Sequence, residues 1–368
     1  LEGRGRIRQL EDRDRDGYYE HASVFADRLL HPTAIHPYKQ GILVGAPPDI
    51  LYFQDTDKAG VADVKRILFS GFGTGNHERL INSFYWGLDN WIYACAGGNG
   101  GEIRNHTVAD PTTVSVDGRD FRFRETADGS WQIEAITGGG QFGITPDDAD
   151  NRFTCWNSSH IIHVVLPDRY MKRNPYFAAP HPLLDIPDHG AAARIYRTSP
   201  LEHWRVVRTT ERRNSPDASR FPASELQPGG YFTAACGLNV FYGNRLGNDY
   251  PGDVFVCDAA NNLIHRDRLR PHGVTFTASR MEEEVEFLTS TDNWFRPTCC
   301  VTGPDGSLYI VDMYRDIIET PNSIKPELLA EIDLAAGFDQ GRLYRVRQLT
   351  DRAIAPRAWE KVSAQAGA

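Results

Sequence analysis

Residues 87–93 read GLDNWIY, a Gly-x-Asp turn followed directly by an apolar run that ends in Tyr. Residues 303–309, GPDGSLY, have the same form, and looser versions occur at 39–44, 148–153 and 252–256. A turn that feeds a short apolar strand, repeated at intervals typical of propeller blades, predicts a radial all-β array. In such a propeller, loops from successive blades converge around a central channel on one face.

The chain divides into about six such units, so we predict an all-β, six-bladed β-propeller with four-stranded antiparallel blades. The units are expected at 4–27, 31–72, 79–137, 138–212, 232–287 and 296–346. The propeller is expected over residues 1–349 and a tail or linker over 350–368, with an upstream segment completing the first blade. A pair of β-sandwiches is the alternative architecture, although the spacing of the turns favours blades.

A few segments depart from the strand pattern. Residues 325–336 are predicted to form a short amphipathic helix in the last blade, with Leu328, Leu329 and Ile332 on one side. Residues 170–193 and 209–228 are rich in Pro, Arg, Asn and Ser and are predicted to be long loops. A polar excursion at 116–131 is interpreted as an extra hairpin.

Composition excludes some classes of protein. The formal net charge of the 368 residues is -9, which argues against a nucleic-acid partner. No apolar run approaches the roughly 20 residues of a membrane helix, so no membrane span is expected. None of the six cysteines forms a C-x-x-C pair, so they are interpreted as small buried strand residues, and disulfide pairing stays open.

An acidic loop near the start of the chain has the pattern of a calcium site. Residues 12–20 fit D-x-D-x-D-G-x-x-E, in which alternate carboxylates and a glycine bend wrap a hard cation. The candidate ligands are Asp12, Asp14, Asp16 and Glu20. Residues 55–63 repeat the frame, but Ala59 replaces the third ligand. The alternative is a solvated acidic turn, partly neutralised by two intervening arginines.

Polar side chains gather in the loops that would surround the propeller axis. These are the loops leading into the first strands, at 73–82, 138–141 and 292–297, and the turns after the second strands, at 96–101, 156–160, 258–262 and 312–315. Trp, Tyr and His beside Asn, Asp and Arg suit the recognition of a planar cofactor or a sugar ring. The candidate cofactor-binding residues are Asn82, Trp86, Asn157, His160, Asn261, Asp312, Tyr314 and Arg315.

Each of these residues also has a purely structural interpretation. A single Asn or Asp in such a loop commonly forms a turn, and His160 can hydrogen-bond a neighbouring backbone group. Arg296 is different, because a charged side chain ahead of a buried strand needs a partner. His160 and His163 are three residues apart on a predicted strand and face opposite sides, which argues against a metal site built on this pair.

Several stretches resemble a known family: FSGFGTGN (69–76), WGLDNWIY (86–93), HVVLPDRY (163–170), NLIHR (262–266), WFRP (294–297) and TGPDG (302–306). They resemble the membrane-bound-dehydrogenase propeller of planctomycete and verrucomicrobial proteins, itself similar to sorbosone and soluble glucose dehydrogenases. In that family a C-x-x-C-H cytochrome domain often follows the propeller. The resemblance therefore implies a periplasmic or otherwise extracytoplasmic protein whose c-type cytochrome partner lies outside this segment.

The resemblance also implies pyrroloquinoline quinone with Ca²⁺, oxidising a sugar or alcohol with the help of a histidine base. Arg296 stands where these enzymes place an arginine before the last Gly-x-Asp strand. Arg79 stands where the catalytic histidine is expected, and His77 lies two residues away, so the candidate catalytic residues are His77, Arg79 and Arg296. Residues 140–141 and 260–262 depart from the pattern, because an Arg-Asn pair and a lysine are expected there.

Two main functions stay open. In the first, an oxidoreductase acts on sugars or polyols; His77 is the base, the two arginines hold anions, and electrons leave to a c-type haem. In the second, a non-catalytic carbohydrate-binding or scaffold propeller stacks sugar rings on Trp86, Trp156, Trp294 and Tyr314. A metal-using lyase or hydrolase with the same pocket is a third possibility.

Overall fold

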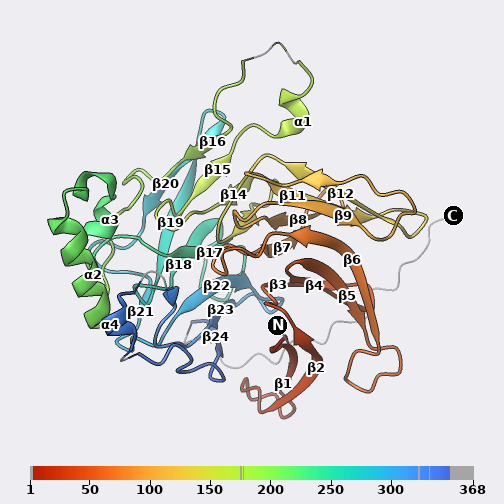
Figure 1. Cartoon of the computed structure of the whole chain (residues 1–368), viewed down its shortest axis with the longest axis horizontal. Helices are drawn as coiled ribbons and strands as arrows, with labels where there is room; N and C mark the ends of the chain where they lie inside the picture. Colours follow the sequence, from red (N-terminus) through yellow and green to blue (C-terminus); the bar gives the residue numbers. More distant parts are fainter. Residues whose placement is uncertain (1–2, 175, 177, 322–323, 331, 349–368) are drawn as a thin grey trace.

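Five antiparallel β-sheets are arranged around a common centre (Figure 1). The computed structural model describes residues 3–174, 176, 178–321, 324–330 and 332–348. Within these residues the chain is an all-β propeller with few helices, which confirms the predicted fold class.

Two strands that follow β8 in the chain, β9 and β10, belong to the first sheet and not to the second. The first has the order β10-β9-β6-β5-β4-β3 and the second β12-β11-β8-β7. The strands of the first are β3 (Ala34–Tyr38), β4 (Gly41–Ala46), β5 (Asp49–Gln54), β6 (Val64–Phe72), β9 (Gly101–Asn105) and β10 (Val114–Ser115). Those of the second are β7 (Asn82–Trp86), β8 (Ile92–Cys95), β11 (Asp120–Glu125) and β12 (Trp131–Ile136).

The remaining three sheets follow in chain order. The third holds β13 (Ile144–Pro146), β14 (Arg152–Thr154), β15 (Ile162–Val164) and β16 (Leu183–Asp185). The fourth holds β17 (Ala235–Val240), β18 (Asp253–Asp258), β19 (Leu263–His272) and β20 (Thr275–Arg280), with β21 (Leu288–Thr289) beside β19. The fifth holds β22 (Pro297–Thr302), β23 (Leu308–Asp312) and β24 (Arg342–Val346). The first strands contact one another in the order β3, β7, β13, β17 and β22, so these five strands follow one another around the centre.

A two-stranded ribbon lies between the fifth sheet and the first. Its strands are β1 (Gly5–Glu11) and β2 (His21–Leu29), which pair with each other. On one side Leu29 packs in a cluster with Val44 and Phe53 of the first sheet. On the other side its loop at Gly17 approaches the Arg345 side chain of β24. The ribbon thus fills the remaining sector of the ring (Figure 1).

The prediction of six four-stranded blades was therefore wrong: the ring has five blades, with three to six strands each, and a ribbon. The N-terminal unit is no blade because β1 has no buried position and β2 has only two, which cannot cover a sheet face. The extra hairpin was also misplaced. Strands β11 and β12 are the outer strands of the second blade, and β9 is the segment that leaves to pair with β6.

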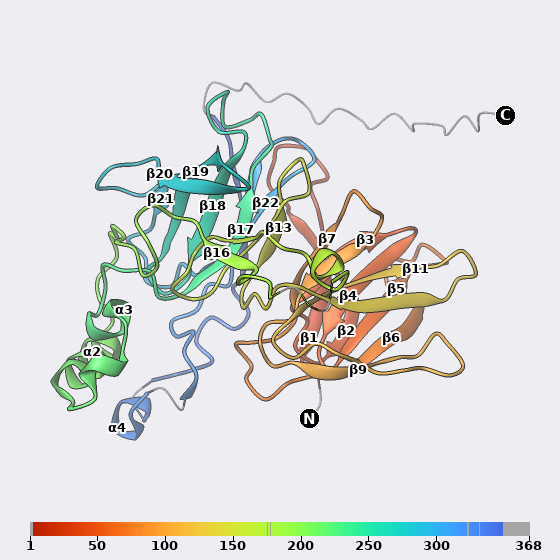
Figure 2. The same cartoon turned by 90° about the horizontal axis from the view of Figure 1, so that it is seen from above.

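Short helices interrupt the later blades. They are α1 (Asp168–Met171), α2 (His203–Asn214), the 3₁₀ turn Ala218–Arg220, α3 (Ala223–Leu226) and α4 (Pro326–Leu329). Only α4 matches the predicted helix, and the prediction of a loop over 209–228 was wrong. The buried residues of α2 are Trp204, Arg205 and Thr209, so two of the three side chains that it buries are polar or charged. Figure 2 shows α2, α3 and α4 together at one side of the sheets. No helix in the described ranges is long and apolar enough to cross a membrane.

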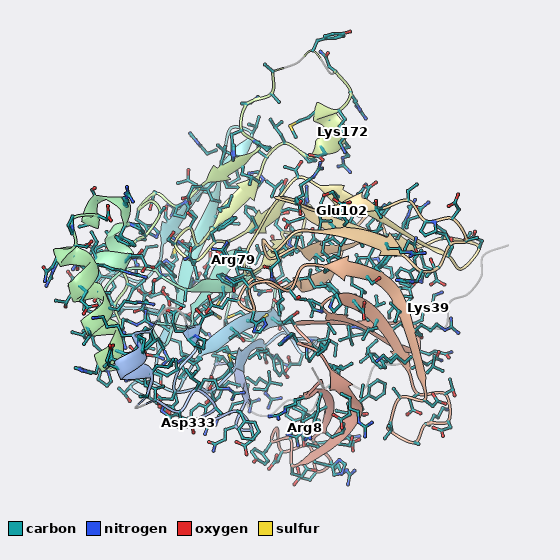
Figure 3. The ribbon with its side chains drawn as sticks, viewed as in Figure 1. Arg8, Lys39, Arg79, Glu102, Lys172 and Asp333 are labelled. Atoms are coloured by element: carbon teal, nitrogen blue, oxygen red, sulfur yellow. The ribbon has the colours of Figure 1, made fainter. Side chains whose placement is uncertain are left out.

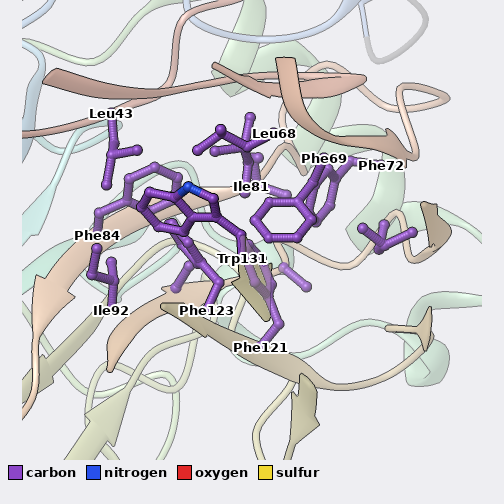
Figure 4. Packing of buried hydrophobic residues seen from close by; sticks show 14 of the residues in the cluster. Leu43, Leu68, Phe69, Phe72, Ile81, Phe84, Ile92, Phe121, Phe123 and Trp131 are labelled. Atoms are coloured by element: carbon purple, nitrogen blue, oxygen red, sulfur yellow. The ribbon is translucent and has the colours of Figure 1, made fainter. Parts of the chain in front are cut away.

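The largest core lies between the first two blades (Figure 4). Phe69 and Phe72 of β6 meet Phe121, Phe123 and Trp131 of the second sheet, and none of these side chains is more than 5% exposed. Burying such aromatic side chains stabilises a fold by roughly 1.5–3 kcal/mol each. One apolar cluster therefore joins the first two blades.

Candidate functional site

Loop 73–81 leads into β7 at the face where the turns after the second strands also lie. Asn99, in the β8–β9 turn, holds this loop. Its Oδ1 accepts from the backbone N of Asn76 at 3.0 Å, and its Nδ2 donates to the carbonyl oxygens of Asn76 and Arg79, each at 2.8 Å. Figure 3 shows Arg79 near the middle of the ring. These hydrogen bonds hold loop 73–81 in one position near the middle of the ring, a region that we call the hub.

Two predicted catalytic residues, His77 and Arg79, are exposed on this loop. The His77 ring lies against His31, with 4.7 Å between the ring centroids. His31 belongs to the connection into β3, so two neighbouring blades bring these histidines together. Burial, and then the charge of His77, lower the pKa of His31 below its ordinary value. His31 was missed because nothing in the local sequence marks a contact across two blades.

The third predicted catalytic residue, Arg296, is 1% exposed. Its Nη1 and Nη2 both lie 3.0 Å from Glu202 Oε1, and Nη1 donates to the Ala259 carbonyl oxygen at 3.2 Å. Burial opposes ionisation of Glu202, but the surrounding arginines, Arg205 before Arg296, hold the pKa of its carboxyl below the ordinary value. The buried charge therefore has an internal partner, the residue immediately before α2.

Most predicted cofactor-binding residues are hydrogen-bonded within the hub. Asp312 Oδ1 accepts from two backbone N–H groups at 2.8 Å, and Asn82 Nδ2 donates to two carbonyl oxygens at 2.9 and 3.0 Å. Asn261 Nδ2 donates to a carbonyl oxygen at 3.1 Å and a carboxylate at 2.8 Å. Arg315 donates to carbonyl oxygens of its own and a neighbouring loop. The backbone of Asn157 accepts from the next sheet at 3.0 Å. These contacts fix the loops.

The predicted aromatic residues do not meet in one place. Trp86 pairs with Ile92 at the end of β7 opposite Asn82, and its ring stacks on Tyr38 with 5.7 Å between centroids. Tyr314 lies 5.6 Å from Trp294, centroid to centroid, on the fifth blade. Trp86 is therefore separate from the hub face, contrary to its predicted place in a shared pocket.

The acidic loop between β1 and β2 gathers three of the four predicted calcium ligands. Asp12, Asp14 and Glu20 each offer one carboxylate oxygen, and these three oxygens lie within 4.8 Å of one another. The Asp16 side chain instead accepts from the backbone N of Tyr18 at 2.6 Å. Oxygen ligands of this kind suit a hard cation such as Ca²⁺.

His160 does not line the hub. It is fully buried, with its ring stacked on Phe232 at 4.4 Å between centroids. Its Nε2 lies 3.1 Å from Asp267 Oδ2 and 3.1 Å from His189 Nε2. With His265 these residues form a cluster whose ligand atoms all lie within 4.8 Å of one another. Sequence reasoning missed the partners, although His265 and Asp267 are two apart on a strand and so share a face.

Two surface pockets of about 470 and 460 Å³ lie away from all these groups. The first is bordered by Trp91, Arg124 and Trp131, and the second by Asp150, His163 and other residues. None of the predicted site residues lines either pocket. His163, on β15, borders the second pocket, whereas His160, which lies before that strand, faces the buried cluster.

Residues 2–350 match a family described as a domain of unknown function (DUF7133), and the chain belongs to this family. No curated protein matches this chain.

Solved structures show only a distant likeness. A luciferin-regenerating enzyme is 9% identical with a TM-score of 0.43, over 90% of this chain and 81% of the other. The soluble aldose sugar dehydrogenase of Escherichia coli is 12% identical with a TM-score of 0.36, over 79% and 95%. A glucose dehydrogenase is 15% identical with a TM-score of 0.38, over 79% and 95%. At these values the likeness assigns no function to this chain.

Proposed function

We propose that this protein binds a polyhydroxylated ligand, a sugar or a polyol, over the hub of the propeller. The observation that carries this proposal is the fixed loop 73–81, which presents the exposed His77 and Arg79, with Arg79 near the middle of the ring (Figure 3). Hydroxyl groups donate and accept hydrogen bonds, so imidazole and guanidinium groups can bind them. Because the loop is held in advance, less ordering entropy is lost when a ligand binds.

Calorimetric titration with a panel of monosaccharides and polyols tests this proposal. We expect members of the panel to bind and Arg79→Ala to weaken binding about tenfold, since hydrogen bonds to charged groups contribute roughly 1.5–3 kcal/mol. Arg8→Ala is the control, because it removes an exposed arginine at the rim of the ring (Figure 3). The proposal is wrong if no compound binds or if both variants behave like the wild type.

A dehydrogenase that oxidises the same ligand is the second candidate, favoured by the contact between His31 and His77. A neutral imidazole can remove a hydroxyl proton as a general base. In this version the protein is extracytoplasmic: His77 takes the hydroxyl proton, an added two-electron acceptor takes the hydride from the carbinol carbon, and its electrons pass to a c-type haem outside this segment. Sugar-dependent reduction of an added dye, lost in His77→Ala while binding persists, would support it; binding without dye reduction under all conditions would contradict it.

Pyrroloquinoline quinone does not fit the hub as this structure describes it. Its carboxylates require free cationic groups. Arg296 is bound to Glu202, and Arg315 donates to backbone carbonyl oxygens. Of the three arginines predicted at the site, this leaves Arg79 to bind the carboxylates of the quinone. One arginine is too few for these carboxylates, so we derive no step through the quinone.

A further inference from the structure

Four side chains that could bind a metal converge between the third and fourth blades. His160 lies two residues before β15, His189 follows β16, and His265 and Asp267 lie on β19. His160, His265 and Asp267 are at most 1% exposed, and the His189 side chain is 21% exposed. Residues from three separate segments are thus brought into one small, almost dry volume.

The nitrogen atoms that meet there are all Nε2. His160 Nε2 lies 3.1 Å from His189 Nε2, and His265 Nε2 lies 3.1 Å from Asp267 Oδ1. Asp267 Oδ2 lies 3.1 Å from His160 Nε2 and 3.9 Å from His189 Nε2. Four-coordinate zinc with bonds of about 2.0–2.1 Å places its ligand atoms about 3.3 Å apart. The three spacings of 3.1 Å are close to that value, and all the ligand atoms lie within 4.8 Å of one another.

The opposite nitrogens of two histidines are held by carboxylates. His265 Nδ1 lies 2.6 Å from Glu286 Oε2, and Arg280 lies 3.0 Å from the other oxygen of Glu286. His189 Nδ1 lies 3.0 Å from Asp188 Oδ1. A carboxylate on Nδ1 fixes the tautomer in which Nε2 is the free ligand atom, and this arrangement accompanies most metal-binding histidines.

A hydrogen-bonded network without an ion accounts for the cluster less well. Two carboxylates around His265 form a sensible ion pair by themselves. The contact between His160 Nε2 and His189 Nε2 is different, because two imidazole nitrogens at this distance share at most one proton. If neutral His189 donates from Nδ1 to Asp188, its Nε2 can only accept, so the single N–H at His160 Nε2 must serve both Asp267 and His189. An ion at the centre uses all the Nε2 lone pairs together.

We propose that His160, His189, His265 and Asp267 bind one divalent first-row transition-metal ion, of which Zn²⁺ is the reference case. Three imidazoles with one carboxylate suit such an ion, whereas Ca²⁺ and Mg²⁺ prefer oxygen ligands throughout. The ion would enter beside His189, the ligand with access to solvent.

The ion would cross-link two blades. Backbone hydrogen bonds already join them here: Asp188 N donates to the Ala278 carbonyl oxygen at 2.9 Å, and Ala278 N donates to Ile186 at 3.0 Å. Four protein ligands leave no open position on a tetrahedral zinc, which is the arrangement of structural sites. The ion would therefore stabilise the junction of the third and fourth blades.

Metal analysis of the tag-free full chain tests the proposal. After incubation with Zn²⁺ and dialysis, we expect about one ion per chain. His189→Asn and Asp267→Asn should lose the ion, whereas His36→Asn, which alters a half-buried histidine elsewhere, should retain it. Glu286→Gln should weaken Zn²⁺ binding about 10–100-fold, because the carboxylate no longer supports His265.

Two measurements keep the test independent of folding failures. Co²⁺ should give the intense visible absorption of a tetrahedral site, and removal of Zn²⁺ from the folded wild type should lower its melting temperature. The proposal is overturned if the wild type retains no stoichiometric Zn²⁺ and gives no such Co²⁺ spectrum. It is equally overturned if His189→Asn and Asp267→Asn, verified as folded, bind Zn²⁺ as tightly as the wild type.

Discussion

At the scale of residues, Asp89 and Asp305 explain the form of the repeated turn. Asp89 Oδ2 accepts from the Tyr93 hydroxyl at 2.9 Å, and Asp305 Oδ2 accepts from the Tyr309 hydroxyl at 3.3 Å. The glycine two residues before the aspartate lies against the tyrosine ring: a Cβ at Gly87 would stand 2.5 Å from Tyr93 Cε2. Gly, Asp and Tyr recur together because each contacts the others, which is why the Gly-x-Asp turn with its following Tyr can be recognised in the sequence.

Gly303→Ala is expected to destabilise the protein by about 1–3 kcal/mol, because the added Cβ would lie 2.2 Å from Tyr309 Cε2. Gly75→Ala is the control, since only the Asn99 side chain lies near, at 4.0 Å. Urea unfolding measures both. Equal stability of the two variants would mean that the tyrosine does not pack on the glycine.

The pH dependence of stability should carry a contribution from Asp120. Burial raises the pKa of this carboxyl to about 6. Because this exceeds the value of about 3.9 in an unfolded chain, the folded state binds the proton more tightly. The stability that Asp120 adds is complete below about pH 4 and is lost as the pH rises through about 6. The unfolding free energy of the wild type relative to Asp120→Asn should fall by about 2 kcal/mol between pH 4 and 7; a constant difference would contradict this.

At the scale of elements, the two acidic loops share one backbone arrangement. Gly17 N donates to Asp12 Oδ2 at 2.9 Å, as Gly60 N donates to Asp55 Oδ2 at 2.8 Å. The backbone N after each first aspartate donates to the last carboxylate of its loop, at 2.8 and 2.9 Å. The repeat inferred from the sequence is therefore present in space, and the loops differ in their carboxylates rather than in their path.

Ca²⁺ is expected to bind the first loop and not the second. Calcium should raise the melting temperature of the wild type, and Asp12→Asn should abolish that rise because it removes a ligand. Asp55→Asn, the matched change in the second loop, should keep it. Differential scanning calorimetry with Ca²⁺ or a chelator measures the effect, and the same response from both variants would refute the assignment.

Helix α2 depends on the ion pair between Glu202 and Arg296. Removing one partner of a buried pair leaves a charge without compensation, so Glu202→Ala should cost about 3–5 kcal/mol. The double variant Glu202→Met with Arg296→Met should cost less, because it also removes the buried guanidinium that Glu202→Ala leaves without its partner, while Arg197 and Arg205 stay in both variants. Urea unfolding compares them. If Glu202→Ala costs less than the double variant, the arginine has no need of this partner, and its role as an anion-binding residue reopens.

At the scale of the whole molecule, the sequence predicted what is decided locally. The Gly-x-Asp turns and the short apolar runs predicted most of the strands, because each such strand is determined by residues a few positions away in the chain. The number of blades was missed because β1 and β2 pair with each other and bury too few positions to form a blade. The strand order was missed because β9 leaves its own blade to pair with β6, a pairing decided in three dimensions. The site followed the same rule. The need of Arg296 for a partner was predictable, but Glu202, 94 residues away, was not. His160 was singled out, yet Asp267 lies 107 residues further along.

The two proposals concern separate parts of the ring: an exposed pair of side chains on loop 73–81 and a buried histidine cluster between the third and fourth blades. Their separation has a consequence for experiments, since loss of the metal ligands should change stability while sugar binding at 73–81 persists in the folded protein.

Anomalous X-ray scattering at the zinc absorption edge, from crystals grown with Zn²⁺, tests the buried cluster most directly. We expect a strong peak between the third and fourth blades, about 2.0–2.1 Å from the Nε2 atoms of His160, His189 and His265 and within bonding distance of Asp267. A map with no peak there, and with the imidazoles joined only by hydrogen bonds or water, would contradict the metal centre.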